Sequence, residues 1–163
     1  MILGVVSDTH NRTSHIEKII DIFNSNKVDC VVHTGDITQA KTLKKFCRLN
    51  STLIGVYGNN DLHEKGLEET SIECGFNFQN PPLVTNIGGR KIAILHEPDG
   101  IKELIENETK LDLILHGHTH RYRLEDINGV KIFNPGECAG ILEGKNSAGL
   151  VYLHNLRIRR VFF

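Results

Sequence analysis

The sequence lacks both an excess of basic residues and a long apolar run, and each absence limits what the protein can bind. Its 163 residues carry 19 lysines and arginines against 20 aspartates and glutamates, which gives a formal net charge of −1. Because phosphate backbones are held mainly by clustered positive charge, we do not expect a nucleic-acid partner. No apolar stretch approaches the roughly 20 residues that a membrane-spanning helix requires, so we expect no membrane association.

Cysteines are few, and they do not have the spacing of a metal or redox motif. Cys30, Cys47, Cys74 and Cys138 form no Cys-x-x-Cys pair. We therefore interpret all four as reduced and mostly buried. The first apolar run, residues 2–7, has no basic segment before it and ends at an acid. This is typical of a first strand rather than a signal peptide, and we expect a cytoplasmic protein.

Internal repeats, low-complexity segments and linkers are also missing. A chain of 163 residues with 39% hydrophobic and 24% charged residues has the composition of an ordinary soluble domain with a sizeable core. We expect one domain over residues 1–163.

The first half of the chain alternates strand and helix patterns. Apolar runs rich in β-branched residues predict three buried strands. They lie at residues 2–7, 28–33 and 52–57. A capping-box pattern at Ser14 and Glu17 predicts a helix from residue 14 to about residue 26, and Thr38 is expected to cap a second helix. Strands separated by helices at these short intervals favour a parallel sheet with right-handed crossovers.

The second half changes character at two hairpin signals. Gly-Gly at residues 88–89 and Asn-Gly at residues 128–129 each separate apolar runs, which predicts antiparallel hairpins. A helical pattern at residues 99–109 leads into a strand at residues 111–115, whereas residues 62–80 predict a loop with a short surface helix. Two further strands are expected at residues 149–153 and 157–163.

Polar side chains follow the ends of the predicted strands, where parallel sheets collect ligand-binding groups. The set comprises Asp8, His10, Asp36, Asn59, His96, His118 and His120. Seven nitrogen and oxygen donors exceed the four ligands of a tetrahedral zinc site. They suit two five- or six-coordinate divalent ions that share a bridging carboxylate.

Three of the histidines lie close together in residues 115–120, Leu-His-Gly-His-Thr-His. Gly117 is expected to let the backbone bend so that two imidazoles face one point. His116 precedes His118 by one alternation step, so we expect it to point to the opposite side and pack there. His33 on the second strand receives the same interpretation.

Such a centre would have the charge that phosphate chemistry needs. Asp8 and Asp36 offset only part of the charge of two divalent ions, which leaves a positive pocket. Two ions about 3.5 to 4 Å apart hold phosphoryl oxygens and lower the pKa of a bridging water. The resulting hydroxide is the expected nucleophile.

The ordered motifs resemble the signature of the calcineurin-like metallophosphoesterases. They are Asp-x-His at residues 8–10, Gly-Asp at 35–36, Gly-Asn-x-Asp at 58–61, the lone His96, and Gly-His-x-His at 117–120. The short length and the Asn-Pro-Gly run at residues 134–136 resemble the small YfcE-like phosphodiesterase branch, and the resemblance covers essentially the whole chain. It implies an α/β fold, a four-layer αββα sandwich of two mixed β-sheets flanked by helices.

The resemblance also implies how the ligands are shared. One metal would be bound by Asp8, His10, Asp36 and His120. The other would be bound by Asp36, Asn59, His96 and His118, with Asp36 as the bridge. Mn²⁺ and Ni²⁺ are the expected ions, and Fe²⁺ and Zn²⁺ also suit the donor set. The expected reaction is hydrolysis of a small phosphodiester.

The chain departs from the family pattern at Asn60, where many family phosphatases have a histidine that protonates the leaving oxygen. An amide cannot deliver a proton, and general acid catalysis is worth about 10² to 10⁴ in rate. We therefore expect a preference for esters with good leaving groups, such as aryl phosphodiesters. Asp61 is expected to orient its neighbours near Asn59 by hydrogen bonding. The expected catalytic residues are Asp36, Asn59, Asn60 and Asp61.

Two other functions remain open. The retromer subunit of vacuolar sorting resembles the same family and serves chiefly as a binding partner, so the alternative is an interaction scaffold with a metal site and little activity. All seven ligand positions are filled here, which favours an enzyme. A DNA-end nuclease would need appended elements that this length leaves out. Glu97, where the family usually has glycine, is expected to be exposed, and the apolar residues 161–163 suit an interface in a homo-oligomer.

Overall fold

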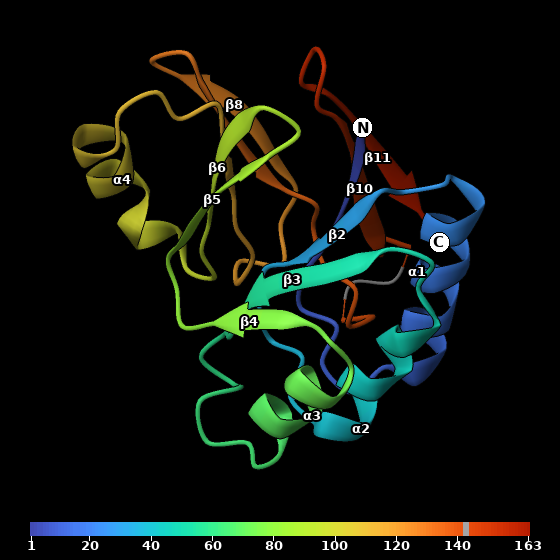
Figure 1. The fold of residues 1–163 in the computed structure, drawn as a ribbon. Helices are drawn as coiled ribbons and strands as arrows, with labels where there is room; N and C mark the ends of the chain where they lie inside the picture. The colour runs from blue at the N-terminus through green and yellow to red at the C-terminus, as the bar shows by residue number, and fades with distance from the viewer. Residues whose placement is uncertain (142–143) are drawn as a thin grey trace.

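The computed structural model describes residues 1–141 and 144–163 and forms two β-sheets with helices on their outer faces (Figure 1). The first sheet has six strands in the order β11-β10-β1-β2-β3-β4, and the second has five in the order β5-β6-β7-β9-β8. Helices α1, α2 and α3 lie beside the first sheet, and α4 lies beside the second. The predicted four-layer arrangement of two mixed sheets is confirmed.

The first sheet contains the parallel strands that the sequence predicts. Its members are β1 (Ile2–Val6), β2 (Cys30–His33), β3 (Thr52–Val56), β4 (Asn77–Gln79), β10 (Ser147–Tyr152) and β11 (Arg157–Phe162). Strands β1 to β4 run parallel, and β10 pairs antiparallel with β1. The edge strand β4 is not predicted by the sequence pattern. Its three residues lack a buried face, so they show no apolar alternation.

The second sheet contains both predicted hairpins. Its members are β5 (Leu83–Ile87), β6 (Arg90–Ile94), β7 (Leu113–Leu115), β8 (Arg123–Ile127) and β9 (Val130–Asn134). The pairs β5–β6 and β8–β9 are antiparallel, whereas β7 lies between β6 and β9 and runs parallel to both. A 3-10 turn, η2 (Pro98–Gly100), and helix α4 (Ile101–Asn107) connect β6 to β7.

The helices beside the first sheet begin where the loops after the strands end. They are α1 (Thr13–Ser25), α2 (Ala40–Leu43), the 3-10 helix η1 (Lys44–Arg48) and α3 (Leu67–Glu73). Both capping predictions are wrong. Helix α1 begins at Thr13, so Ser14 lies inside the helix and cannot cap it. The residue before the helix is Arg12, which makes no side-chain cap and whose N–H donates to Thr9 O in the preceding turn. Thr38 lies outside α2 with φ 71°. No helix in the described ranges has the length and apolarity to span a bilayer.

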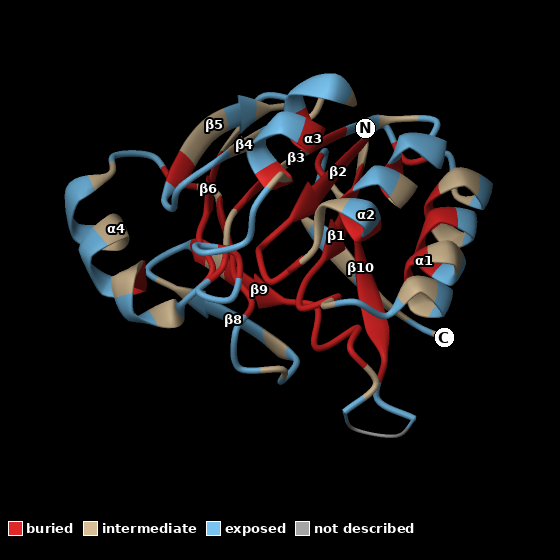
Figure 2. Cartoon of the chain, turned by 90° about the horizontal axis from the view of Figure 1, so that it is seen from below, coloured by how far each residue is buried: buried red, intermediate tan, exposed pale blue. Residues whose placement is uncertain are grey.

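Apolar residues form three successive layers that hold the sheets and helices together. One layer packs α1 and η1 on the first sheet, a second fills the space between the two sheets, and a third packs α4 on the second sheet. Figure 2 shows buried residues along the central strands and exposed residues on the outer sides of α1 and α4. This packing brings loops at the ends of both sheets together, since the His118 N–H donates to the Asp8 carboxylate at 3.2 Å.

The prediction of four reduced cysteines is wrong for two of them. Cys47, which is exposed, and Cys74, which is half-buried, form a disulfide, whereas Cys30 and Cys138 are buried and free. The pair lies 27 residues apart in sequence, and its proximity arises only because α3 packs against α2. The predicted cytoplasmic location relied on reduced cysteines and on an N-terminus unlike a signal peptide. The disulfide removes the first of these arguments, and the location stays a prediction.

Replacing Cys47 with serine is expected to lower the free energy of unfolding of the oxidised protein by about 3.5 kcal/mol. The disulfide closes a segment of 27 residues, and loop-closure entropy for a ring of that size corresponds to about this value. Urea denaturation followed by circular dichroism, with and without a reductant, measures the difference. In reductant the wild type and the variant should unfold alike, and a deficit of the same size there would contradict the disulfide as its cause.

Candidate metal centre

The seven predicted metal ligands all lie in loops at the carboxyl ends of strands, and the structure brings them together. Asp8 and His10 follow β1, Asp36 follows β2, Asn59 follows β3, His96 follows β6, and His118 and His120 follow β7. Their donor atoms form two adjoining groups, with Asp36 between them. Both sheets therefore contribute to the centre.

The first group consists of Asp8, His10 and His120, whose donor atoms lie within 4.8 Å of one another. His120 Nε2 is 3.5 Å from Asp8 Oδ1, and His10 Nε2 is 3.9 Å from Asp36 Oδ2. His10 Nε2 is buried and has no hydrogen-bond partner. A buried polar atom normally has a partner, and a divalent cation would supply one here. The group therefore fits a metal ion.

The second group is built from Asn59, His96 and His118. Asn59 Oδ1 lies 2.9 Å from His96 Nε2 and 3.1 Å from His118 Nδ1, and the two imidazole nitrogens are 3.3 Å apart. Asp36 Oδ1 lies 3.4 Å from His96 Nε2. Asp36 thus directs one carboxylate oxygen towards each group. Two imidazole nitrogens, an amide oxygen and a carboxylate oxygen therefore converge. Such a donor set suits a divalent transition metal.

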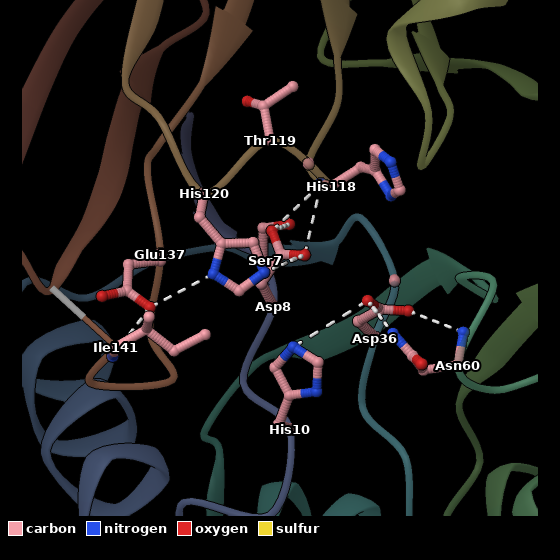
Figure 3. Close-up of polar contacts among 12 residues, drawn as sticks. Ser7, Asp8, His10, Asp36, Asn60, His118, Thr119, His120, Glu137 and Ile141 are labelled. Carbon is pink, nitrogen blue, oxygen red and sulfur yellow. Dashed lines mark hydrogen bonds and ion pairs between the residues drawn. The ribbon is translucent and has the colours of Figure 1, made fainter.

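Hydrogen bonds on the far side of two imidazoles fix their orientation. The Nδ1–H of His96 donates to Thr34 O at 2.9 Å, which leaves Nε2 to act as a ligand. His120 Nδ1 lies 3.2 Å from Glu137 Oε2, while its other nitrogen faces Asp8. Figure 3 shows the His120 ring between these two carboxylates.

Glu137 is the residue at the centre that sequence reasoning misses. It is fully buried, and its Oε2 also accepts the N–H of Ile141 at 3.2 Å. It follows directly after the Asn-Pro-Gly run at residues 134–136, beyond the end of β9. An acid at the carboxyl end of a parallel strand is the signal that would have found it.

The backbone at most donor positions is in the left-handed region, which is uncommon for residues other than glycine. The donors concerned are Asp8 (φ 51°), His10 (φ 43°), Asp36 (φ 60°), His118 (φ 67°) and His120 (φ 57°). Backbone hydrogen bonds hold part of this conformation, since His10 N–H donates to Asp36 O at 2.9 Å. Each such residue costs on the order of 1 kcal/mol, and clustering of this kind is typical of functional sites.

Two glycines allow the loops to approach the carboxylates. A Cβ atom at Gly117 would collide with Ser7 Oγ, and one at Gly58 would collide with Asp36 Oδ1. Gly117 is expected from its sequence context to permit a bend, but its φ is not positive. A glycine is required at position 117 because its backbone lies too close to the loop after β1 to leave room for a side chain.

The two central carboxylates have different environments. Burial raises the pKa of Asp8, even though Ser7 Oγ–H donates to it at 2.5 Å. Burial also opposes ionisation of Asp36, but the hydrogen bond and charge of His96 and the hydrogen bonds from Asn60 hold its pKa well below the ordinary value. Asn60 donates twice to this carboxylate, from Nδ2 at 2.7 Å and from its backbone N–H at 3.0 Å.

Asp61 holds the loops rather than facing the donor groups. Its buried carboxylate accepts the backbone N–H groups of Asp36, Ile37, Thr38 and Gly58 at 2.7 to 2.9 Å. Burial raises its pKa. These contacts tie the loop after β2 to the loop after β3, so Asp61 is a positioning residue for Asp36 as well as for the turn that contains Asn59.

The two histidines that the sequence excludes as ligands lie outside both donor groups. His116 is buried beside Gly117 O, at 3.1 Å from Nδ1, and burial lowers its pKa to about 4. His33 is buried with Nε2 3.0 Å from Thr9 Oγ1, and burial lowers its pKa to about 3. Both are neutral packing residues.

Solved structures with a similar fold include a phosphodiesterase, a phosphoesterase and a Vps29 protein. A structure described as a novel archaeal phosphodiesterase superposes with a TM-score of 0.91 at 32% identity, over 100% of both chains. YfcE, a phosphoesterase of E. coli, superposes with a TM-score of 0.68 at 21% identity, over 99% of this chain and 98% of its own. Vps29 of Entamoeba histolytica, solved in complex with zinc, has a TM-score of 0.70 at 18% identity over 99% of both chains. The last two likenesses concern the fold alone.

Sequence comparison extends the likeness along the chain. A phosphodiesterase of Methanocaldococcus jannaschii is 32% identical over 163 residues, which cover 99% of this chain and 98% of that protein. The sequence pattern of the calcineurin-like phosphoesterase superfamily domain matches residues 1–156. The chain belongs to the calcineurin-like phosphoesterase superfamily.

Proposed function

We propose that this chain is a phosphodiesterase that uses two divalent metal ions. The observation that carries the proposal is the position of Asp36, whose two carboxylate oxygens lie 3.9 Å from His10 Nε2 and 3.4 Å from His96 Nε2. One carboxylate between two donor groups is the arrangement that a shared bridging ligand requires. Membership of the family supports phosphoester hydrolysis, and the 32% identical phosphodiesterase of M. jannaschii supports diesters.

The two donor groups support a division of the ligands between the two ions. One ion would be held by Asp8, His10, Asp36 and His120, and the other by Asp36, Asn59, His96 and His118. Mn²⁺ and Ni²⁺ are the first candidates, and Fe²⁺ and Zn²⁺ suit the same mixture of nitrogen and oxygen. When bound, two such ions supply a hydroxide nucleophile at neutral pH and positive charge opposite the phosphoryl oxygens. Glu137 and Thr34 would keep the imidazoles of His120 and His96 in place.

The leaving oxygen has no proton donor at position 60. The Asn60 amide donates to Asp36 and carries no acidic proton, so it can help to hold Asp36 but cannot protonate an alkoxide. We propose that the preferred substrates are small phosphodiesters whose leaving group is stable without a proton.

A scaffold of the Vps29 type is the competing function, and the donor set favours the enzyme. The likeness to Vps29 at 18% identity concerns the fold. Every expected donor is present, and their atoms converge within hydrogen-bonding or ion-pair distances.

Removal and return of metal tests the proposal. Protein dialysed against a chelator should lose hydrolysis of bis-p-nitrophenyl phosphate, and Mn²⁺ or Ni²⁺ should restore it. Inductively coupled plasma mass spectrometry should find about two ions per chain at full activity. If no divalent ion restores hydrolysis, the enzyme is excluded, and a stable metal content without turnover would favour the scaffold.

A further inference from the structure

A cavity adjoins the second donor group and extends away from the metal centre. Its volume is about 560 Å³, and Asn59 and His96 form one end of its lining. The rest of the lining comes from the turn after β3, the two prolines before β5, and the segment from β6 through α4. Sites of this size accommodate small organic ligands. The cavity therefore has room for one of the two alcohol groups of a phosphodiester bound at the metal centre.

Most of the cavity wall is apolar. The apolar lining residues are Leu62, Pro81, Pro82, Leu95 and Leu104, with Tyr57 beside them. Leu62 is 60% exposed although it is a large hydrophobic residue. Its side chain adds apolar surface that a bound ligand could cover. The wall suits an alcohol with an apolar body rather than a sugar.

Apart from His96, which belongs to the second donor group, the ionisable side chains with a charge in the cavity lining are acidic. Glu97, Glu103 and Glu108 line it, and the lining contains no lysine or arginine. Glu108 is neutralised by Lys91 at 2.7 Å. Glu97 and Glu103 are exposed and have no ion pair among the residues that the structure describes, so solvent screens their charges in part. Two uncompensated carboxylates beside apolar surface favour a positive ligand group and repel a negative one.

We propose that this cavity binds the alcohol group of the phosphodiester substrate that is not expelled, and that it selects an apolar alcohol bearing a positive charge. An amino alcohol or a quaternary ammonium alcohol meets both requirements. The inference rests on the proposed function for the position of the phosphate. It adds the chemical class of the substrate. Diesters that carry a further phosphate on the alcohol group in the cavity would be rejected.

Two matched substrates isolate the effect of a positive charge on the retained alcohol group. In p-nitrophenyl phosphorylcholine and its carbon isostere, in which a tert-butyl group replaces the trimethylammonium group, the leaving group and the shape are the same. We expect kcat/KM to be about tenfold higher for the charged diester, mainly through a lower KM, because one cation would lie near two carboxylates. Equal values for the two diesters would overturn the proposal.

Variants of the acidic residues locate the effect. Glu103→Gln should reduce the preference about threefold, and the Glu97→Gln, Glu103→Gln double variant should bring the ratio close to one. Glu106→Gln is the control, because this residue lies on the same helix, pairs with Lys102 and does not line the cavity. It should leave both the ratio and the activity unchanged. A preference that survives the double variant would overturn the proposal.

A binding measurement separates failure of this inference from failure of the proposed function. Calorimetric titration of the metal-loaded protein with phosphocholine and with its tert-butyl isostere needs no turnover. Tighter binding of phosphocholine, lost in the double variant, would support the cavity assignment even if bis-p-nitrophenyl phosphate is not hydrolysed. Hydrolysis of bis-p-nitrophenyl phosphate together with equal binding of both ligands would overturn the cavity assignment alone.

Discussion

Replacement of Asp36 by asparagine is expected to lower kcat/KM on bis-p-nitrophenyl phosphate by about 10³-fold or more, because this carboxylate serves both donor groups. Its two oxygens face His10 and His96. Asparagine has nearly the same shape but brings no negative charge and only one oxygen. The variant should therefore bind fewer than two ions. Steady-state kinetics and metal analysis of the same preparation measure both effects.

An exposed aspartate provides the matched control. Asp21 lies on the outer side of α1. Asp21→Asn removes the same charge from the chain without touching the centre, and its activity should stay within about twofold of the wild type. Circular dichroism should show that both variants are folded. Asp36→Asn protein that keeps two ions and full activity would contradict the shared-ligand assignment.

Replacement of Asn60 by histidine is expected to raise turnover of alkyl phosphodiesters far more than that of aryl phosphodiesters. An imidazolium at this position can protonate an alkoxide leaving group, and general acid catalysis is worth about 10² to 10⁴ in rate. A p-nitrophenolate leaving group gains little, because it is already stable as an anion. The measurement is the ratio of kcat for an alkyl diester to kcat for bis-p-nitrophenyl phosphate in variant and wild type.

An alanine variant separates proton donation from the loss of a hydrogen bond. Asn60 Nδ2 donates to Asp36 at 2.7 Å, and alanine removes that bond without supplying a proton donor. Asn60→Ala should lower turnover on both classes of ester and leave their ratio unchanged. The same gain on alkyl and aryl esters in Asn60→His would show that the effect is not leaving-group protonation.

The elements that could be predicted from the sequence are those whose signal is local. Buried parallel strands give continuous apolar runs, and the Gly-Gly and Asn-Gly turns mark the hairpins β5–β6 and β8–β9 without reference to the rest of the chain. The edge strand β4 is too short and too exposed to give a pattern. The Cys47–Cys74 disulfide depends on how α3 packs against α2, which no local signal contains.

The donor set could be predicted for a related reason. Parallel strands place their carboxyl ends on one edge of the sheet, so polar residues just beyond successive strands meet in space. Glu137 follows the same rule, but the Asn-Pro-Gly turn at residues 134–136 separates it from its strand in the sequence, so the pattern does not indicate it. The cavity next to the second donor group could not be predicted, because Leu62, Pro81 and Glu103 belong to segments without a shared motif and meet only through tertiary packing.

The left-handed backbone at the donors has a consequence for engineering this protein. Glycine adopts such φ values without penalty, so a glycine at the position of His118 or His120 would relieve local strain while removing a donor. Stability and catalysis are opposed at these positions. A library of variants sorted only by melting temperature would therefore accumulate well-folded chains that have lost their chemistry.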